Sequence, residues 1–308
     1  MSTPAPPDRW TVCTWPSVDY GPPLVLDTIT EDRAEGLRAL IPAARTSAWE
    51  TAVQLLEWTT TRWEHANDHV DNGDATDVLE GVAAGRRFAC VEYSIVLSQA
   101  LNALGIPARR LALRSRDSHV GFGRGHVVSE AWIDDLGKWV LLDGQNGAWW
   151  GSESGPLGYS ELHALFSSGD ERPRMVPTAR AISAQDENIW WLYFDSAISS
   201  GMAWSKPYVA TFQGNPAPVR LLAAPDAIVY PDLSQLATAI VELPDGCGAA
   251  FTPIHPYANA VQAGPDRLAI GESVEFAYLF GETAVADIAT VTPYGTLDAH
   301  LLSLETTS

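Results

Sequence analysis

One stretch of the chain, GRRFACVEYSIVLSQALNALGIPARR (Gly85 to Arg110), most constrains the fold because it predicts a helix that must be buried. Apolar residues recur in it at intervals of three and four, and others widen the stripe until little of the helix is left for water. Gly105 stands where a left-handed residue ends a helix, and Pro107 cannot continue one. We therefore expect one domain to be built around this helix, with a strand following over Ala108 to Arg114.

Cys90 opens this helix, and its position suggests chemistry. A thiol in the first turn lies beside unpaired backbone N–H groups and the positive end of the helix dipole. That placement favours the thiolate by about 0.3–1 kcal/mol, which is less than one pKa unit, so a nearby imidazolium is needed to activate the thiol. Taken alone, a single cysteine is more often a small buried apolar residue.

A hairpin further along the chain supplies a histidine and an aspartate. His126 to Ile133 and Lys138 to Asp143 are rich in strand formers, and Asp134 to Gly137 is predicted as the turn between them. If the last residue of the first strand pairs with the first of the second, His126 and Asp143 are diagonal neighbours on one face. Their Cβ atoms would then be about 7–8 Å apart, which an imidazole and a carboxylate can bridge.

Other residues compete for these roles. His119 is a rival base, but it lies in the glycine-rich segment from residue 115 to 125, which is predicted to be a mobile surface loop. Asp134 and Asp135 are rivals to Asp143, although both belong to the predicted turn. Glu130 shares the face of His126 and contacts either a substrate or a neighbouring strand.

Composition limits the class of protein. The 308 residues suit two domains, and 46% hydrophobic with 19% charged residues is a globular composition. The first residues have no basic and apolar leader, and no apolar run is long enough to span a bilayer, so we expect a soluble cytoplasmic protein. A net charge of −19 makes nucleic acid and membranes poor partners. Three cysteines without paired spacing fit a reducing compartment.

The pattern of elements predicts an α+β domain followed by a β-rich one. Helices are expected over Thr28 to Ala43, Ser47 to about His69, Asp77 (as the cap) to Ala84, Tyr159 to Phe166 and Asp186 to Phe194. Beyond Pro207, short β-rich runs separated by turn signals are typical of a small β-sandwich. These runs are Thr238 to Leu243, Ala250 to Ile254, Val274 to Phe280, Ala286 to Thr292 and Ala299 to Leu304.

The order of four motifs resembles the transglutaminase-like superfamily of papain-related thiol enzymes. FACVEY is followed by a helix ending in ALGIPARR, then by GHVVSEAW and by KWVLLDG. The resemblance covers about Trp58 to Gly147, and bacterial members share this order. It implies a papain-like, transglutaminase-like core in residues 1–205, with an N-terminal extension over 1–45, and leaves residues 206–308 as the β-sandwich-like domain.

Carried over position by position, the resemblance implies that Cys90 is the nucleophile, His126 the general base and Asp143 the residue that orients the base. It implies acyl transfer through a thioester on Cys90, either hydrolysis or transamidation, on an amide or peptide substrate. An amine is then a possible acceptor, and neither a cofactor nor a metal is expected. Trp149 and Trp150, just after Asp143, line a substrate groove, with Trp190, Trp191 and Trp204 nearby in sequence, or these tryptophans pack between the two domains.

Three alternatives stay open at this point. The fold could be a non-catalytic peptide- or protein-binding module, because a fold does not guarantee activity. His65 and His69, four residues apart, could hold a metal for a hydrolase, but no third ligand is visible and a solvated helix end is favoured. Trp58 or Trp63 could donate an indole N–H to an oxyanion, although core packing is favoured for both. The oligomeric state is not indicated.

Overall fold

The chain divides into two compact units, Pro22–Pro231 and a second made of Met1–Gly21 with Asp232–Ser308. In the second unit the N-terminal strand β1 (Arg9–Val12) pairs antiparallel with the C-terminal strand β17 (His300–Thr307). The domain limits expected from the sequence, 1–205 and 206–308, stay a prediction beside this division. The computed structural model describes residues 9–12, 26–115, 125–159, 161–162, 165, 173–194, 196–199, 209–211, 236–243, 246–253, 255–270, 273–277, 283–297 and 300–307.

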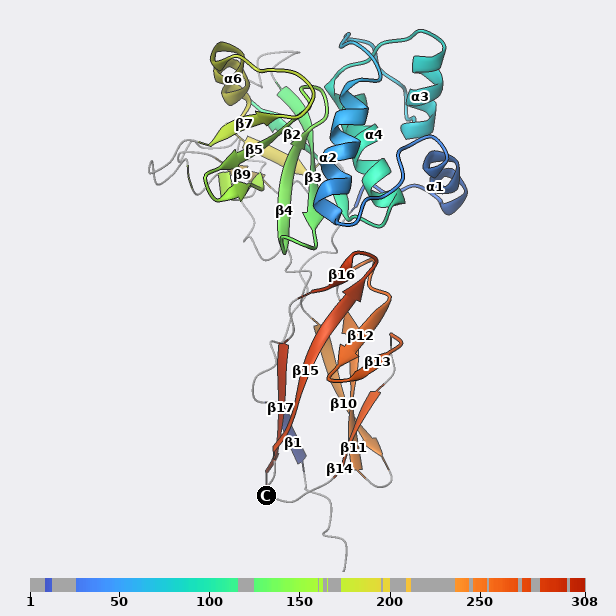
Figure 1. Cartoon of the computed structure of the whole chain (residues 1–308), viewed down its shortest axis with the longest axis vertical. Helices are drawn as coiled ribbons and strands as arrows, with labels where there is room; N and C mark the ends of the chain where they lie inside the picture. The colour runs from blue at the N-terminus through green and yellow to red at the C-terminus, as the bar shows by residue number, and fades with distance from the viewer. Residues whose placement is uncertain are drawn as a thin grey trace, which may run out of the picture. The chain divides into compact units, whose positions relative to one another are not determined.

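The first unit combines helices with an antiparallel sheet (Figure 1). None of the helices in the described part of the chain is both long and apolar enough to cross a membrane. The helices are α1 (Glu31–Arg38), α2 (Ala48–Thr60), α3 (Ala75–Ala83), α4 (Cys90–Ala103) and α6 (Ala184–Trp190), which runs into the 3-10 helix η2 (Trp191–Tyr193).

Two helices are shorter than predicted. The helix expected over Thr28 to Ala43 ends at Arg38, ahead of Pro42, which disfavours a helical conformation in the residue before it. The helix expected to reach His69 ends at Thr60, within a run of three threonines whose branched side chains are poor helix formers. Beyond it, Trp63 turns into the interior and donates its indole N–H to the carbonyl of Phe88 at 3.2 Å.

Helix α3 begins at a different cap from the one predicted. Asp74, not Asp77, is the N-cap, and its side chain accepts from the backbone N–H groups of Thr76 and Asp77. The side chain of Asp77 in turn accepts the backbone N–H of Asp74 at 2.8 Å. The two aspartates three residues apart form a capping box, so the helix begins three residues earlier than predicted.

Helix α4 is the buried helix that the sequence predicts. Eleven consecutive residues, Glu92 to Asn102, are buried. The helix ends as expected at Gly105, which has a φ of 81°. The N–H of Gly105 bonds to the carbonyl of Asn102 and that of Ile106 to the carbonyl of Leu101, so the end is a Schellman motif.

The sheet of the first unit has the strand order β6-β5-β4-β3-β2-β8-β9, with β7 paired to β5. Helix α4 packs against β3 and β2. The hairpin β3–β4 has the predicted register, with Ile133 opposite Lys138. The strands are β2 (Ala108–Arg114), β3 (Gly125–Ile133), β4 (Lys138–Asp143), β5 (Ala148–Ser152), β6 (Gly155–Pro156), β7 (Arg174–Pro177), β8 (Ser196–Ser199) and β9 (Val209–Thr211).

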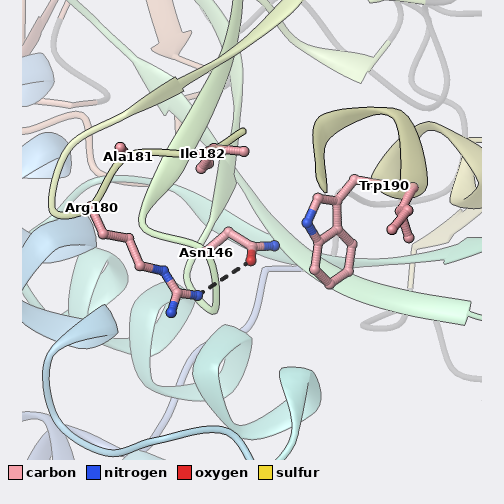
Figure 2. Close-up of a pocket in the computed structure, with 6 residues that line it drawn as sticks. Asn146, Arg180, Ala181, Ile182 and Trp190 are labelled. Atoms are coloured by element: carbon pink, nitrogen blue, oxygen red, sulfur yellow. Dashed lines mark hydrogen bonds between the residues drawn. The ribbon is translucent and has the colours of Figure 1, made fainter. Parts of the chain in front are cut away.

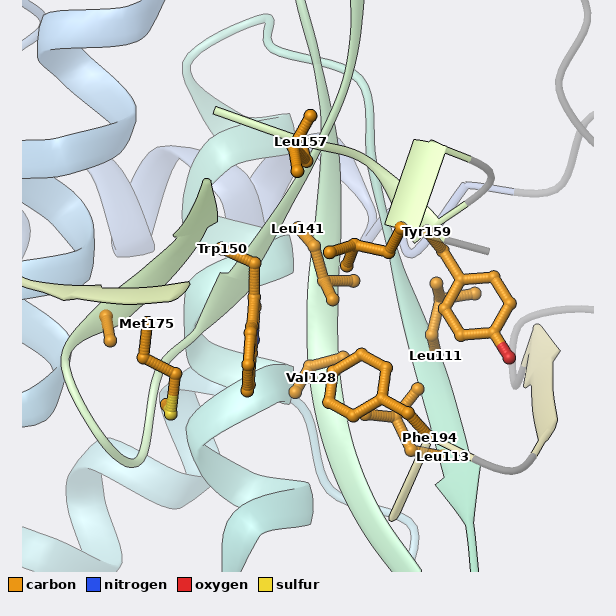
Figure 3. Packing of buried hydrophobic residues seen from close by; sticks show 11 residues of the cluster. Leu111, Leu113, Val128, Leu141, Trp150, Leu157, Tyr159, Met175 and Phe194 are labelled. Atoms are coloured by element: carbon orange, nitrogen blue, oxygen red, sulfur yellow. The ribbon is translucent and has the colours of Figure 1, made fainter. Parts of the chain in front are cut away.

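A cluster of buried apolar side chains holds these strands to the segment around η2 (Figure 3). Trp150 lies at its centre, with ring centroids 4.4 Å from Trp191 and 4.7 Å from Phe194. The cluster joins residues of β2, β3, β4, β5 and β7 with four that lie outside these strands, Leu157, Tyr159, Leu162 and Phe194. Its members on the strands are Leu111, Leu113, Val128, Leu141, Ala148, Trp150 and Met175.

In the described residues of the second unit, the strands form two antiparallel sheets. One has the order β1-β17-β15-β12-β13, with β16 paired to β15, and the other has the order β10-β11-β14. Each of the five predicted strand runs overlaps a strand, and Ile254, residues 278–280 and Ala299 of these runs lie outside the described residues. The packing of the two sheets as a sandwich stays a prediction. The remaining bounds are β10 (Leu236–Leu243), β11 (Gly246–Pro253), β12 (Ala260–Ala263), β13 (Asp266–Leu268), β14 (Ser273–Ala277), β15 (Thr283–Thr292) and β16 (Gly295–Thr296).

Asn102 links the end of α4 to the start of β2 by hydrogen bonds. Its buried amide accepts the backbone N–H of Ala108 at 3.0 Å and donates to the carbonyls of Asp27, Ser98 and Ala108. Replacing Asn102 by Ala leaves these buried groups without that partner, so we predict a loss of about 1–3 kcal/mol in the free energy of unfolding. Urea denaturation measures it. Asn67→Ala, at an exposed position, is the matched control, and equal stability of the two variants would contradict the prediction.

Candidate active site

Cys90 is the first residue of α4 and is half-buried. The residue before it, Ala89, is the N-cap and offers no side-chain hydrogen bond to the helix. The sulfur of Cys90 is instead bound from the sheet, by the side chain of His126 and by the backbone N–H of Val127. It is a free thiol.

The backbone of Val127 is available to α4 because β4 ends early. The pairing of β3 with β4 runs from Ile133–Lys138 to Ser129–Leu142 and stops there. Trp132 donates its backbone N–H to the carbonyl of Pro107, on the side of β2. Backbone N–H and carbonyl groups point to alternate sides along a strand, so those of Val127 point to the side of β4. There its carbonyl accepts the hydroxyl of Ser94 at 2.8 Å. One residue of β3 therefore binds two side chains of the helix.

A glycine lets the helix approach this strand end. Gly144 follows the last residue of β4, and a Cβ added there would lie 3.2 Å from the carbonyl oxygen of Tyr93 on α4. That distance is tighter than ordinary contact, so a larger residue would press against the helix backbone. The glycine after Asp143, at the end of the KWVLLDG motif, thus allows α4 to lie close to the end of β4.

His126 and Asp143 are bonded to each other in the interior. The Nε2 atom of His126 lies 2.8 Å from Oδ2 of Asp143, and both side chains are almost completely buried. The predicted register of the hairpin accounts for this meeting, since it makes the two residues diagonal neighbours. With Nε2 engaged by the carboxylate, Nδ1 is left to face the sulfur of Cys90. The structure thus brings Cys90, His126 and Asp143 into one hydrogen-bonded chain.

Asn146 completes the shell around the carboxylate. Its backbone N–H donates to Oδ1 of Asp143 at 3.0 Å, and its side-chain amide donates to Oδ2 at 2.8 Å. Asn146 was not among the site residues predicted from the sequence. The signal was present, because an aspartate followed three residues later by asparagine, between two glycines, is a pattern in which the carboxylate accepts the N–H groups of the turn.

These contacts shift the three pKa values in directions that suit a reactive thiol. Burial alone would raise the pKa of the Cys90 thiol, but the hydrogen bond and charge of His126, with the N–H of Val127, lower it overall. Burial would lower the pKa of His126, but the charge and hydrogen bond of Asp143 raise it. Burial would raise the pKa of Asp143, and His126 and Asn146 lower it. The charged forms of all three groups are therefore favoured together.

Two aromatic rings cover the imidazole. The ring of Trp190, the last residue of α6, has its centroid 4.5 Å from that of His126, and the ring of Tyr193 lies at 6.0 Å. The sequence pointed to Trp190 only as a companion of Trp149 and Trp150 at a possible groove, and it did not point to Tyr193. Their contact with His126 depends on how the segment after β7 folds back over the sheet.

A pocket opens beside this covered pair. It has a volume of about 360 Å³ and is lined by Asn146, Arg180, Ala181, Ile182, Ile189 and Trp190. Figure 2 shows Arg180 reaching toward Asn146 on one side, with Trp190 across from them. Because Asn146 binds Asp143 and Trp190 covers His126, the pocket shares its wall with the His126–Asp143 pair.

The other predicted site residues lie elsewhere. Glu130 is completely buried; it forms an ion pair with Arg109 at 3.0 Å and accepts the N–H of Tyr159 at 2.9 Å. Trp150 is 1% exposed and belongs to the apolar cluster. Trp149 is half-buried and packs edge-on against Trp49 at 5.5 Å. We therefore leave Glu130 and Trp150 out of the proposed substrate site.

The competing histidines and aspartates have separate surroundings. His119 lies outside the described residues, and so does Trp204. His69 bonds to the carboxylate of Glu92 at 3.1 Å, and the pKa of the exposed His65 is lowered by partial burial and by the charge of His126. Asp135 accepts the backbone N–H of Trp49. Among the described residues, no group of three or more metal-ligating side chains comes together.

The two tryptophans considered as oxyanion donors differ. The indole N–H of Trp63 is engaged by the carbonyl of Phe88, and its ring stacks on Tyr93 with centroids 4.1 Å apart. Its side chain therefore belongs to the core, as favoured from the sequence. Trp58 is half-buried, and the guanidinium of Arg62 lies over its ring at 4.9 Å.

Comparison with known proteins identifies a family for part of the chain. Residues 37–144 match the model of the transglutaminase-like superfamily, and this range contains Cys90, His126 and Asp143. No curated protein matches the sequence.

Two solved structures show weak likenesses. A putative cysteine protease from Cytophaga hutchinsonii is 18% identical over 37% of this chain and 36% of its own, with a TM-score of 0.27. A putative protease from Parabacteroides distasonis is 13% identical over 80% of this chain and 50% of its own, with a TM-score of 0.28. Half or less of each of these chains is therefore matched, and such scores establish no shared fold.

The surroundings of Glu130 predict a structural effect of its removal. Glu130→Ala leaves the buried guanidinium of Arg109 without this carboxylate, so we expect the free energy of unfolding to fall by about 3–5 kcal/mol. Thermal and urea denaturation measure this change. Glu80→Ala, at an exposed position of α3, is the control and should change stability little. A stable Glu130→Ala protein would show that the pair is not needed for folding.

The pKa directions predict how the reactivity of Cys90 depends on pH. The alkylation rate of Cys90 by iodoacetamide should reach half its maximum below the pH of about 8.5 that is typical of a free thiol. In His126→Ala the lowering influence of the imidazolium is lost while burial still raises the pKa, so the midpoint should move upward. Mass spectrometry of the Cys90 peptide follows the rate, with glutathione as the reference thiol. Unchanged midpoints in the two proteins would contradict the assignment.

Proposed function

We propose that this chain, whose residues 37–144 form a domain of the transglutaminase-like superfamily, is a thiol-dependent enzyme that cleaves or transfers the acyl group of amide bonds in peptides. The observation that carries the proposal is the chain of hydrogen bonds from the Cys90 sulfur through His126 to Asp143. A nucleophile bonded to a base, which is bonded to an orienting carboxylate, is the arrangement that covalent acyl transfer requires.

In this proposal Cys90 is the nucleophile. Its thiolate attacks the carbonyl carbon of the amide and forms an S–C bond, while the carbonyl oxygen takes the negative charge. His126 then gives the proton on Nδ1 to the amide nitrogen, the C–N bond breaks and the amine leaves. The acyl group remains on Cys90 as a thioester.

The second half of the reaction uses the same groups. Neutral His126 takes a proton from water or from an amine, whose oxygen or nitrogen attacks the thioester carbon and releases the Cys90 thiolate. Water gives hydrolysis and an amine gives transamidation, so both outcomes share one intermediate. Asp143 keeps the imidazole oriented and its positive charge balanced throughout. Its own orientation is held by Asn146.

Roles for the rest of the chain complete the proposal. The N-terminal position of Cys90 on α4 adds the field of the helix to that of His126. In this proposal the β-rich C-terminal region forms a β-sandwich and supplies none of the three reacting groups, which all lie in residues 37–144. We expect the enzyme to need no cofactor, because sulfur, imidazole and carboxylate supply every proton and electron pair in the steps above.

The proposal predicts a covalent intermediate on Cys90. Mixing the protein with a synthetic tetrapeptide library and quenching with acid should leave an acyl mass on the Cys90 peptide that hydroxylamine removes. Cys90→Ser should lower turnover by about a thousandfold or more. Cys247→Ser is the matched control and should keep full activity.

Other results would select the alternatives. Peptides that bind without being cleaved by either protein would favour a non-catalytic binding module. Activity that survives in Cys90→Ser but is lost with a chelator would favour a metal-dependent hydrolase. Adding glycine methyl ester as an amine separates transamidation from hydrolysis, since only transamidation yields the new amide.

A further inference from the structure

The pocket beside the His126–Asp143 pair is close enough to select the substrate. Its volume of about 360 Å³ lies within the range of small-ligand sites and suits one or two amino-acid side chains. Trp190 lines the pocket and also stacks over His126, with ring centroids 4.5 Å apart. A substrate held near the imidazole therefore meets the residues of this pocket.

The lining has two chemically distinct sides. Ala181, Ile182, Ile189 and Trp190 make an apolar side, and Ile189 is 49% exposed. Arg180 and Asn146 make the polar side, and Figure 2 shows the guanidinium of Arg180 aimed at the amide of Asn146. Apolar area fixes the shape of a ligand group, while a few placed polar groups fix its orientation.

The guanidinium of Arg180 has spare capacity for an anion. Its Nη2 donates to the carbonyl of Gln145 at 3.3 Å and to Oδ1 of Asn146 at 3.5 Å, which are long bonds to neutral acceptors. Within the described part of the chain it forms no ion pair. An arginine has five N–H donors in a planar fork that matches a carboxylate, so most of them are left for a ligand.

The location of this positive charge is notable because the chain is acidic, with 38 carboxylate side chains against 19 lysines and arginines. The net charge of the chain favours neutral or cationic substrates. At the pocket, Arg180 supplies a local positive charge that favours an anionic group instead. Asn146 already gives its N–H groups to Asp143, so it presents Oδ1 to Arg180 and helps to fix the guanidinium.

We propose that Arg180 determines specificity, by binding a carboxylate that the substrate carries next to an apolar side chain and close to the scissile amide. The position of the carboxylate relative to a scissile amide rests on the proposed function. The preference of Arg180 for binding a carboxylate does not. The substrates are then acidic peptides, or peptides cleaved beside a free C-terminal carboxylate. Arg180 selects these substrates and takes no part in the bond changes.

The test begins with binding, which needs no turnover. Tetrapeptide libraries are made with Glu and Asp or with Gln and Asn in their place, each with a C-terminal carboxylate or a C-terminal amide. The Cys90→Ala full-length protein is mixed with each library, and retained members are identified by mass spectrometry. Carboxylate members should be enriched, and comparing the four libraries shows whether the carboxylate belongs to a side chain or to the terminus.

Substitutions of Arg180 then assign the preference. Arg180→Gln should lower the affinity for carboxylate members about ten- to hundredfold, the effect of one hydrogen bond to a charged group, and leave neutral members unchanged. Arg180→Lys keeps the charge without the fork and should retain part of the preference. Arg45→Gln, which removes another exposed arginine without an ion pair among the described residues, should change nothing.

The outcomes separate this inference from the proposed function. If Arg180→Gln abolishes the enrichment of carboxylate members, Arg180 is supported as the selecting residue. If the wild-type protein in that case turns over none of these peptides, the catalytic proposal is overturned. Turnover of peptides with equal kcat/KM for matched carboxylate and amide members overturns the role of Arg180 and leaves the catalytic proposal standing. The role of Arg180 is also overturned if adding Arg180→Gln to the Cys90→Ala protein leaves its affinity for carboxylate peptides unchanged.

Discussion

The buried bond between His126 and Asp143 is the interaction on which the site depends. Two charged groups taken out of water are costly unless each is paired and its remaining hydrogen-bonding capacity is met. Here the carboxylate receives the imidazole, a backbone N–H and an amide N–H, and the imidazole meets the sulfur on its other nitrogen. The ring of Trp190 covers the imidazole, which strengthens these interactions by keeping water from it.

The early end of β4 allows Cys90, the third group of the site, to lie beside His126. Strand β4 stops pairing at Leu142, so the backbone of Val127 is left for α4, and Gly144 allows the helix to come close. The Schellman end at Gly105 and the amide of Asn102 fix the other end of the same helix to β2. The position of Cys90 is therefore set at both ends of α4, and its reactivity follows from where the helix is held.

Much of this arrangement could be predicted because it depends on local pattern. The end of α4, the limits of β2 and the hairpin register followed from Gly105, strand-forming residues and a four-residue turn, and the register implied the pairing of His126 with Asp143. What the sequence left open depended on tertiary packing. Of the two contacts considered for Glu130, a substrate or a neighbouring strand, the structure shows the strand, because Arg109 lies opposite it on β2. Trp190 and Arg180 reach the site from a segment that is distant in sequence.

The backbone groups of Val127 that hold α4 have a second consequence. An unpaired edge of a sheet is a template on which a strand from another molecule can add, and proteins usually guard such edges. Cys90 and Ser94 occupy the N–H and the carbonyl that an incoming strand would need at this point. The contacts that hold the thiol beside its base therefore also occupy the backbone groups of Val127 that β4 leaves unpaired.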